Sequence, residues 1–262
     1  MSTLATQSCG LLEVTGLSKA FGGVRAVEDF SFNAQPGEIV GIIGPNGAGK
    51  TTAFNLVTGV YTPDKGSVKL DGVELSGWRQ DMIARAGIGR TFQNIRLFKG
   101  LTVLENVMTA SDPYAPYNFF SAILALPGKR SAERQAAEKA REYLDLVGLA
   151  GMEDARPESL PYGLQRKLEL ARALAIQPKI VLLDEPAAGL NPSEVRDFIE
   201  LVRRLHDRFH FTIVFIEHRM EVVMNLSHKL FVLSFGKLLA SGDPESVRRN
   251  PEVIEAYIGE EE

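Results

Sequence analysis

The sequence has few features that would mark an unusual class of protein. It holds one cysteine among 262 residues, so no internal disulfide can form and we expect a reducing compartment. Lysine and arginine number 29 against 33 aspartate and glutamate residues, a net charge of -4. This balance argues against a nucleic-acid-binding protein, which usually carries an excess of basic charge. Charged residues make up 24% and apolar residues 45% of the chain, which excludes collagenous and intrinsically disordered classes.

Long apolar runs are missing as well. No stretch approaches the roughly 18 consecutive apolar residues that a membrane-spanning helix needs. Residues 1–10 contain neither lysine nor arginine and no apolar run, so we expect no secretory signal and an ordinary thiol at Cys9. These absences predict a soluble, cytoplasmic protein with one large core and at most an attached subdomain.

Short apolar segments alternate with helical patterns, which predicts an α/β fold with a largely parallel sheet. The apolar runs at residues 39–43, 180–183 and 213–216 are continuous, as in strands that are buried on both faces. The expected strands lie at residues 11–14, 31–34, 38–43, 67–70, 180–183, 212–216 and 230–233.

The middle of the chain has a different pattern. From about residue 93 to 176 it is helical, and Ser131 and Gly148 are the predicted N-cap and C-cap of one helix. Residues 111–128 are rich in proline, tyrosine and phenylalanine; they form either a loop packed on its own aromatic rings or a contact with a partner. The expected organisation is an α/β core at 11–92 and 176–240, a helical subdomain at 93–175 and a C-terminal tail at 241–262.

The strongest motif is Gly44-Pro-Asn-Gly-Ala-Gly-Lys-Thr51, a G-x-x-x-x-G-K-T between an expected strand and a helical pattern that begins at Thr52. This context predicts a phosphate-binding loop. Its glycines let backbone N–H groups surround phosphate oxygens, and the next helix presents its positive end. Lys50 would contact the β- and γ-phosphates, and the Thr51 hydroxyl can ligate Mg²⁺. The predicted nucleotide-binding residues here are Gly44, Asn46, Gly47, Ala48, Gly49, Lys50, Thr51 and Thr52.

Two carboxylates follow a second expected strand. Asp184 and Glu185 come directly after the aliphatic run at residues 180–183, at the strand end where open α/β sheets bind ligands. Asp184 is suited to the coordination shell of Mg²⁺. Glu185 is suited to polarising a water molecule for in-line attack on the γ-phosphate.

Histidines follow or flank a third expected strand. His218 comes after residues 212–216, and its position after the two other motifs favours a contact with the γ-phosphate over a structural role. His206 and His210 are spaced by four residues. Because no third metal ligand is evident near them, we interpret this pair as a solvated helix face.

These motifs, in this order, resemble the ATP-binding subunits of ABC transporters, and the resemblance covers nearly the whole chain. Gly89-Arg-Thr-Phe-Gln93 is similar to the glutamine loop that links the nucleotide to the transmembrane partner. Residues 160–164, Leu-Pro-Tyr-Gly-Leu, align with the L-S-G-G-Q signature, and residues 188–192 align with the D-loop at the dimer contact. The implied fold is an ABC ATPase cassette, a P-loop NTPase core with a RecA-type mixed sheet and an inserted helical subdomain.

The resemblance also implies a site for ATP and Mg²⁺ that two chains share. In the family, the signature of one subunit closes over the ATP held by the P-loop of another, so Tyr162 and Gly163 would face the nucleotide of a second cassette. Phe21 would stack on adenine, and His218 becomes the switch histidine. The implied catalytic residues are Gln93, Glu185 and His218, and the implied metal ligands are Thr51, Gln93 and Asp184.

The signature departs from the family pattern. Pro161 replaces its serine, Tyr162 its first glycine and Leu164 its glutamine. Proline offers neither a hydroxyl nor an N–H to phosphate, whereas the Gly163 N–H and the helix dipole remain available. We therefore expect a weakened contact rather than an inactive site. Asn191 stands where the D-loop usually has aspartate, which keeps hydrogen bonding without the charge.

A narrower resemblance concerns the transported substrate. Residues 90–98, 184–192, 217–220 and 250–259 are similar to the bacterial branched-chain amino-acid uptake ATPases. Related ATPases for urea uptake or lipopolysaccharide export share much of this pattern, so those substrates stay open. The implied partners are transmembrane permease subunits, a second identical or different cassette and, indirectly, a substrate-binding protein, at the cytoplasmic face of the bacterial inner membrane. The expected permease contact is Gln93 with residues 95–98.

Two other functions compete with transport. A soluble ABC-type ATPase that acts on nucleic acid or ribosomes usually has two cassettes or a long coiled-coil insertion, whereas this chain has one cassette and a net charge of -4. A non-hydrolysing regulatory cassette would account for the altered signature. Retention of Glu185 and His218 argues against it for the site built on this chain's own P-loop.

Overall fold

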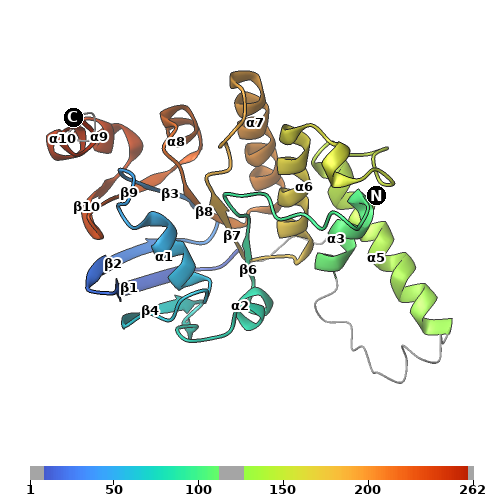
Figure 1. Cartoon of the computed structure of the whole chain (residues 1–262), viewed down its shortest axis with the longest axis horizontal. Helices are drawn as coiled ribbons and strands as arrows, with labels where there is room; N and C mark the ends of the chain where they lie inside the picture. The colour runs from blue at the N-terminus through green and yellow to red at the C-terminus, as the bar shows by residue number, and fades with distance from the viewer. Residues whose placement is uncertain (1–8, 112–126, 259–262) are drawn as a thin grey trace.

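A six-stranded sheet forms the centre of the molecule. The computed structural model describes residues 9–111 and 127–258, and Figure 1 shows the sheet between helices on both sides. Five of its strands run parallel to one another, and the sixth, at one edge of the sheet, is antiparallel to its neighbour. Its order is β10 (Lys237–Gly242), β9 (Lys229–Ser234), β3 (Ile39–Ile43), β8 (Thr212–Ile216), β7 (Ile180–Asp184) and β6 (Ile88–Arg90).

A second, antiparallel sheet holds the other strands. Its order is β2 (Val24–Ala34), β1 (Leu12–Phe21), β4 (Lys65–Leu70) and β5 (Val73–Glu74). The strands expected at residues 11–14, 31–34 and 67–70 therefore pair with one another and not with the parallel strands. The alternating sequence pattern cannot show this, because it reports which face is buried and not which strand is the neighbour.

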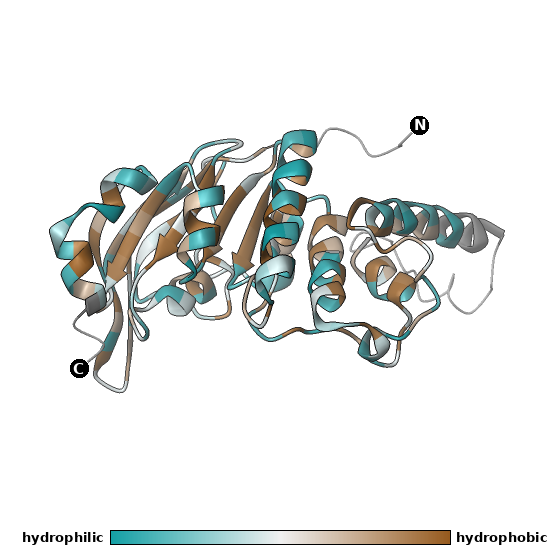
Figure 2. Ribbon diagram, turned by 90° about the horizontal axis from the view of Figure 1, so that it is seen from above, coloured by the Kyte–Doolittle hydropathy of each residue, from teal (hydrophilic) through white to brown (hydrophobic). Residues whose placement is uncertain are grey.

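The parallel strands are the apolar core. Every residue of β3, β7 and β8 is buried, which confirms the expectation from their continuous apolar runs. Alternate side chains of β3 enter different hydrophobic clusters: Ile39 and Ile43 pack with the helices on one face, and Val40 and Ile42 face the antiparallel sheet. The hydropathy colouring of Figure 2 shows the same concentration of apolar residues on the strands.

Helices cover the two faces of the parallel sheet. α1 (Lys50–Val57) contributes its apolar side chains to the cluster shared with the antiparallel sheet. α7 (Pro192–Phe209) and α8 (Met220–Leu226) pack on the opposite face. The remaining core helices are α2 (Gln80–Ala86) beside β6, and α9 (Pro244–Arg248) and α10 (Pro251–Ile258) after β10.

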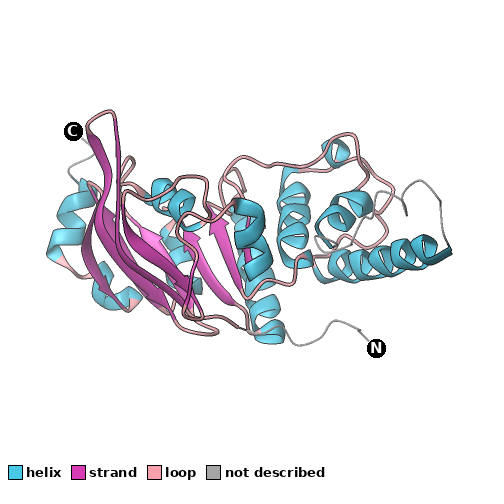
Figure 3. Ribbon diagram, turned by 90° about the horizontal axis from the view of Figure 1, so that it is seen from below, coloured by secondary structure: helices cyan, strands magenta, loops and turns pink. Residues whose placement is uncertain are grey.

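Three helices lie together at the end of the molecule away from the antiparallel sheet (Figure 3); we call them the helical body, and their apolar side chains join the cluster on the α7 face of the parallel sheet. They are α3 (Val103–Ser111), α5 (Pro127–Leu146) and α6 (Tyr162–Ala175), and they pack on one another. A short 3₁₀ turn, Pro157–Ser159, precedes α6. Within residues 9–111 and 127–258, no helix is both long enough and apolar enough to cross a bilayer.

Two expectations for this helical part are wrong. α5 begins at Pro127 and not after Ser131, because proline suits the first turn of a helix as well as a polar cap does. Residues 93–102 are not helical, since the Asn106 side chain holds their backbone through hydrogen bonds to the Phe98 N–H and carbonyl. Gly148 is confirmed just beyond the end of α5, with a left-handed φ of 75°. Residues 112–126 of the predicted insertion lie outside the described residues.

Candidate functional site

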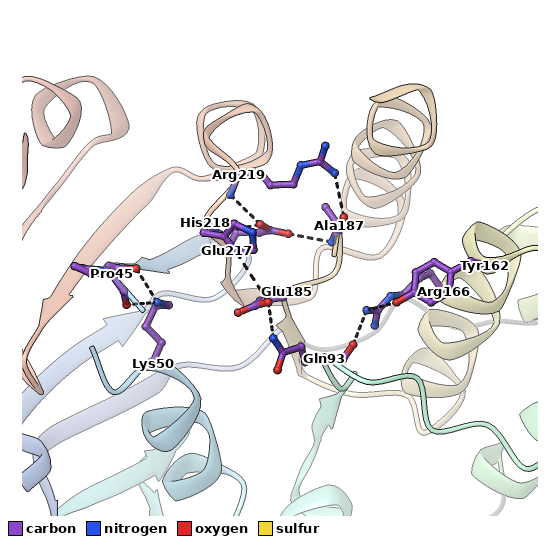
Figure 4. A network of polar contacts seen from close by, with 11 residues as sticks. Pro45, Lys50, Gln93, Tyr162, Arg166, Glu185, Ala187, Glu217, His218 and Arg219 are labelled. Atoms are coloured by element: carbon purple, nitrogen blue, oxygen red, sulfur yellow. Dashed lines mark hydrogen bonds and ion pairs between the residues drawn. The ribbon is translucent and has the colours of Figure 1, made fainter. Parts of the chain in front are cut away.

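The three sequence motifs meet at one edge of the parallel sheet. β8 lies between β3 and β7, with Ile216 paired to Ile42 on one side and to Asp184 on the other. The segments that leave the carboxyl ends of these strands therefore carry the P-loop, the two carboxylates and His218 to one place (Figure 4). This edge is where parallel α/β sheets bind ligands.

The P-loop has a backbone that only glycine can adopt at two positions. Gly44 has a φ of 148°, and a Cβ there would lie 2.0 Å from the Leu233 carbonyl oxygen. Gly49, with a φ of 100°, would place a Cβ 2.2 Å from the Ala26 carbonyl oxygen. Side chains are excluded at both positions, so the loop backbone stays close to β2 and β9, with the tight glycine-rich path that a phosphate cradle of backbone N–H groups requires.

Lys50 lies at the start of α1 with its side chain bent over the P-loop. Its buried ammonium donates to the Gly44 and Pro45 carbonyl oxygens, each at 2.7 Å (Figure 4). Thr51 is exposed in the first turn of the same helix. The positive charge, the helix N-terminus and the exposed hydroxyl therefore lie together, as binding of a phosphate chain requires.

Gln93, Glu185 and His218 converge from three separate segments. The Gln93 amide donates to the Glu185 carboxylate at 2.7 Å, and the same carboxylate oxygen lies 3.9 Å from the His218 Nδ1. Glu185 has a left-handed φ of 45°, and its N–H donates to the Ile216 carbonyl at 3.0 Å. The site thus contains a positioned carboxylate, a group that can act as a general base, with an amide and an imidazole beside it.

Asp184 is buried and paired with Arg90, a residue that the sequence interpretation missed. One carboxylate oxygen accepts from Arg90 at 2.8 Å, and Arg90 also donates to the Asn55 and Thr58 side chains at 2.9 and 2.7 Å. Burial raises the pKa of Asp184 above its ordinary value, and the Arg90 hydrogen bond and charge oppose that rise. The other oxygen, Oδ1, finds no donor among the described residues. A buried carboxylate oxygen that lacks a donor fits the coordination shell of Mg²⁺.

The signature residues contact their own chain. The Tyr162 hydroxyl accepts from Arg166 at 2.9 Å, and a Cβ at Gly189 would lie 2.8 Å from the Tyr162 ring. Arg166 also donates to the Phe92 and Gln93 carbonyl oxygens, at 2.8 and 2.5 Å. Arg166 was also missed; its spacing of four residues from Tyr162 on one helix face is the signal that could have indicated it.

Other predicted residues lie at the margins of this site. Phe21 ends β1 with 41% of its surface exposed, and its ring meets Tyr61 edge-on at 5.1 Å. The Gly163 backbone faces the Glu194 carboxylate. Asn191 is the N-cap of α7, where its amide oxygen accepts two N–H groups at 3.0 Å, so helix capping accounts for this residue.

The interpretation of the histidine pair is wrong for one member. His206 is half-buried, with its Nε2 2.9 Å from the Gly37 carbonyl oxygen and its ring against Phe211. Burial lowers the pKa of His206. His210 is exposed at the end of α7. In the described part of the chain, no three or more histidine, cysteine, aspartate or glutamate side chains form a group that could hold a metal ion.

A groove of about 520 Å³ lies beside the glutamine loop, between the sheet core and α6. Apolar side chains and arginines share its wall: the Arg96 guanidinium lies 4.3 Å from the centre of the Phe92 ring, and that of Arg172 lies 4.8 Å from the Phe98 ring. Of the expected contact residues 95–98, Arg96 and Phe98 therefore border this groove.

Comparisons with known proteins agree with this geometry. The family model described as "ABC transporter" matches residues 27–188, and that described as "Branched-chain amino acid ATP-binding cassette transporter" matches residues 237–262. The high-affinity branched-chain amino acid transport ATP-binding protein LivG of Escherichia coli is 45% identical, covering 95% of this chain and 98% of LivG. BraF of Pseudomonas aeruginosa, with the same description, is 44% identical over the same shares.

Solved structures resemble the whole chain as well. The ADP conformation of MJ1267, an ATP-binding cassette of an ABC transporter, has a TM-score of 0.82 and 31% identity, over 95% of this chain and 99% of that one. A dimeric post-hydrolysis state of the cassette MJ0796, bound to ADP and phosphate, has a TM-score of 0.74 and 25% identity, over 89% and 98% of the two chains. The chain therefore belongs to the ABC transporter family and is one of its ATP-binding cassettes, with the fold and ATPase character of that family.

Proposed function

We propose that this cassette couples ATP hydrolysis to the uptake of branched-chain or similar hydrophobic amino acids through a membrane permease. The observation that supports it best is the convergence of Gln93, Glu185 and His218 beside the P-loop. The descriptions of LivG and BraF support the choice of substrate. Urea and lipopolysaccharide remain the alternatives, because specificity in such systems resides in the binding protein and permease.

The chemistry follows from the positions of the side chains. Lys50 and the P-loop N–H groups bind the phosphates, and Lys50 exchanges its two carbonyl partners for phosphate oxygens. Glu185 accepts a hydrogen bond from the attacking water and takes up its developing proton. His218 contacts the γ-phosphate, and Gln93 orients the Glu185 carboxylate through the hydrogen bond seen here. Phe21 offers its exposed ring to adenine.

Magnesium fits the same site. Asp184 would hold the ion through the oxygen that lacks a donor, with Thr51 and Gln93 as the other protein ligands. When bound, the ion neutralises charge on the β- and γ-phosphates. Arg90 fixes the orientation of the Asp184 carboxylate before the ion arrives.

Two cassettes and a permease complete the proposed assembly. The dimeric structure of MJ0796 with ADP and phosphate supports a pair of composite sites, in which Tyr162 and Gly163 face the nucleotide of the second cassette. The groove beside residues 95–98 would receive a cytoplasmic segment of the permease at the inner face of the bacterial membrane. A separate binding protein would deliver the amino acid.

Replacement of Glu185 by glutamine tests the catalytic role. The amide keeps the shape and the contact with Gln93 but cannot accept a proton, so ATP turnover should fall roughly 10²- to 10⁴-fold while ATP still binds. Glu200→Gln, at an exposed position of α7, should leave both properties unchanged. Phosphate release and nucleotide-binding titrations measure them. Unchanged turnover in Glu185→Gln would remove Glu185 from the mechanism, and uptake of labelled urea rather than leucine by the reconstituted transporter would overturn the substrate.

A further inference from the structure

A second glutamate beside the switch histidine is fully buried and has no place in the mechanism above. Glu217 is 0% exposed. One of its carboxylate oxygens accepts from the Ala187 N–H at 3.0 Å, and the other accepts from the His218 and Arg219 N–H groups, each at 3.0 Å. A buried carboxylate is costly unless it is fully hydrogen-bonded, and here three backbone donors satisfy it.

Arg219 makes the reciprocal contacts. Its guanidinium donates to the Ala187 carbonyl at 3.1 Å and to the Leu190 carbonyl at 3.0 Å. The loop at residues 187–190 is therefore held through both its N–H and its carbonyl groups by the loop at residues 217–219 (Figure 4). We call these contacts of Glu217 and Arg219 with residues 187–190 the loop clasp.

The clasp joins the two segments that carry the reacting groups. The loop at residues 187–190 follows Glu185, whose carbonyl accepts from the Ala188 N–H at 3.0 Å. His218 directly follows Glu217. Gly189, at the far side of the clasped loop, lies against the Tyr162 ring of α6. The loop that leads from Glu185 therefore also contacts α6.

We propose that Glu217 and Arg219 are positioning residues: through the loop clasp they hold the backbone of His218 and the segment after Glu185 as one unit. This proposal rests on the proposed roles of Glu185 and His218. A carboxylate is needed at position 217 because all three partners are donors and a carboxylate has only acceptors. An amide can serve the His218 and Arg219 N–H groups with its oxygen, but its NH₂ then faces the Ala187 N–H.

Glu217→Gln is therefore the direct test. The purified protein should still bind ATP, with an unchanged KM, while kcat falls roughly 10- to 100-fold because the reacting groups are misplaced. Hydrogen exchange of the Ala187 amide should become faster. The matched control is Glu38→Gln, at a carboxylate that accepts the Gln35 N–H at 2.8 Å near the start of β3, at the opposite end of the sheet. It should leave kcat and Ala187 exchange unchanged.

A double-mutant cycle separates positioning from a general loss of structure. In a His218→Ala background, Glu217→Gln should lower kcat by a smaller factor than in the wild type, because part of its effect is exerted through His218. If the two losses of kcat multiply in the double variant, the clasp is contradicted. It is also contradicted if Glu217→Gln keeps the kcat and the Ala187 exchange rate of the wild type. If Glu217→Gln does not fold, Arg219→Gln replaces it, since Arg219 is only partly buried. This variant should also lower kcat and make Ala187 exchange faster.

The cycle also distinguishes this proposal from the proposed function. Wild-type turnover in His218→Ala would contradict the role of His218 in hydrolysis. Faster Ala187 exchange in Glu217→Gln would in that case still show that the clasp holds the loop. If Ala187 exchange is unchanged in Glu217→Gln while His218→Ala lowers turnover as expected, only the clasp is contradicted.

Discussion

Pro161 stands at the position that aligns with the serine of the L-S-G-G-Q signature. It is the N-cap of α6, where its carbonyl accepts the Leu164 and Gln165 N–H groups but no side-chain oxygen caps the helix. The first N–H groups of this helix are therefore left to the solvent or to a phosphate. A serine hydroxyl at this position could serve both the helix and a nucleotide on a facing cassette.

Pro161→Ser should consequently have two effects. Capping should stabilise α6 by about 1 kcal/mol, which corresponds to a rise in Tm of about 2–4 °C for a chain of this size. ATP hydrolysis by the dimer should become faster, because the hydroxyl reaches the facing γ-phosphate. Pro161→Ala is the control, since it removes the ring without adding a hydroxyl. Equal turnover in the two variants would show that the hydroxyl has no role in catalysis.

Single functional residues could be predicted from the sequence where they belong to a short contiguous motif. Lys50, with the loop glycines, could be recognised because the P-loop is contiguous. Arg90 could not, and for Arg166 only the spacing from Tyr162 gave a signal, because the partners Asp184 and Gln93 lie far along the chain and come near only when β6, β7 and α6 are packed. Their long side chains look like ordinary surface charges until the distant partner is known.

The Glu74 carboxylate connects β5 to β4 through hydrogen bonds from Ser67 and Val68. Partial burial raises the pKa of Glu74, but hydrogen bonds from Ser67, Ser76 and the Val68 N–H outweigh this and lower it from 4.5 to about 2. Because the folded-state pKa lies below the unfolded one, the carboxylate stabilises the fold above about pH 4.5, and this contribution disappears as the pH falls towards about 2.

Glu74→Gln should therefore lower Tm at pH 7 and have a progressively smaller effect in acid. Thermal unfolding of the variant and the wild type, measured from pH 7 downwards, would show the two curves approaching each other as Glu74 becomes protonated. Glu13→Gln, at an exposed position of the neighbouring strand β1, is the control and should track the wild type throughout. A difference in Tm that does not depend on pH would contradict the role of the charge.

Elements were predictable where local pattern and tertiary environment agree. The continuous apolar runs of β3, β7 and β8 predict strands that are buried on both faces, and every residue of these strands is buried. Residues 93–102 have a helical pattern but no helix, because Asn106 binds the backbone of Phe98 and Arg166 binds the carbonyl of Gln93. His206 turns inward because the Gly37 carbonyl, distant in sequence, offers it a partner.

At the scale of the whole molecule, the groove beside the glutamine loop suits a partner protein. Phe98 lies on its wall with 51% of its surface exposed, under the Arg172 guanidinium. The backbone of Phe98 is held independently of its ring, by hydrogen bonds to the Asn106 amide at 2.9 and 3.0 Å. Aromatic and arginine side chains together are typical of the residues that dominate binding energy at protein interfaces.

Phe98→Ser should therefore separate ATP hydrolysis from transport. The isolated cassette should keep its turnover, because the ring does not contact Glu185, His218 or the P-loop and the loop backbone retains its bonds. Affinity for membranes that contain the permease should fall roughly 30-fold or more, as for loss of an interface hot spot, and uptake of labelled leucine should fall with it. Ile254→Ser, at an exposed apolar position of α10, should change neither. Normal membrane binding by Phe98→Ser would place the permease contact elsewhere on the cassette.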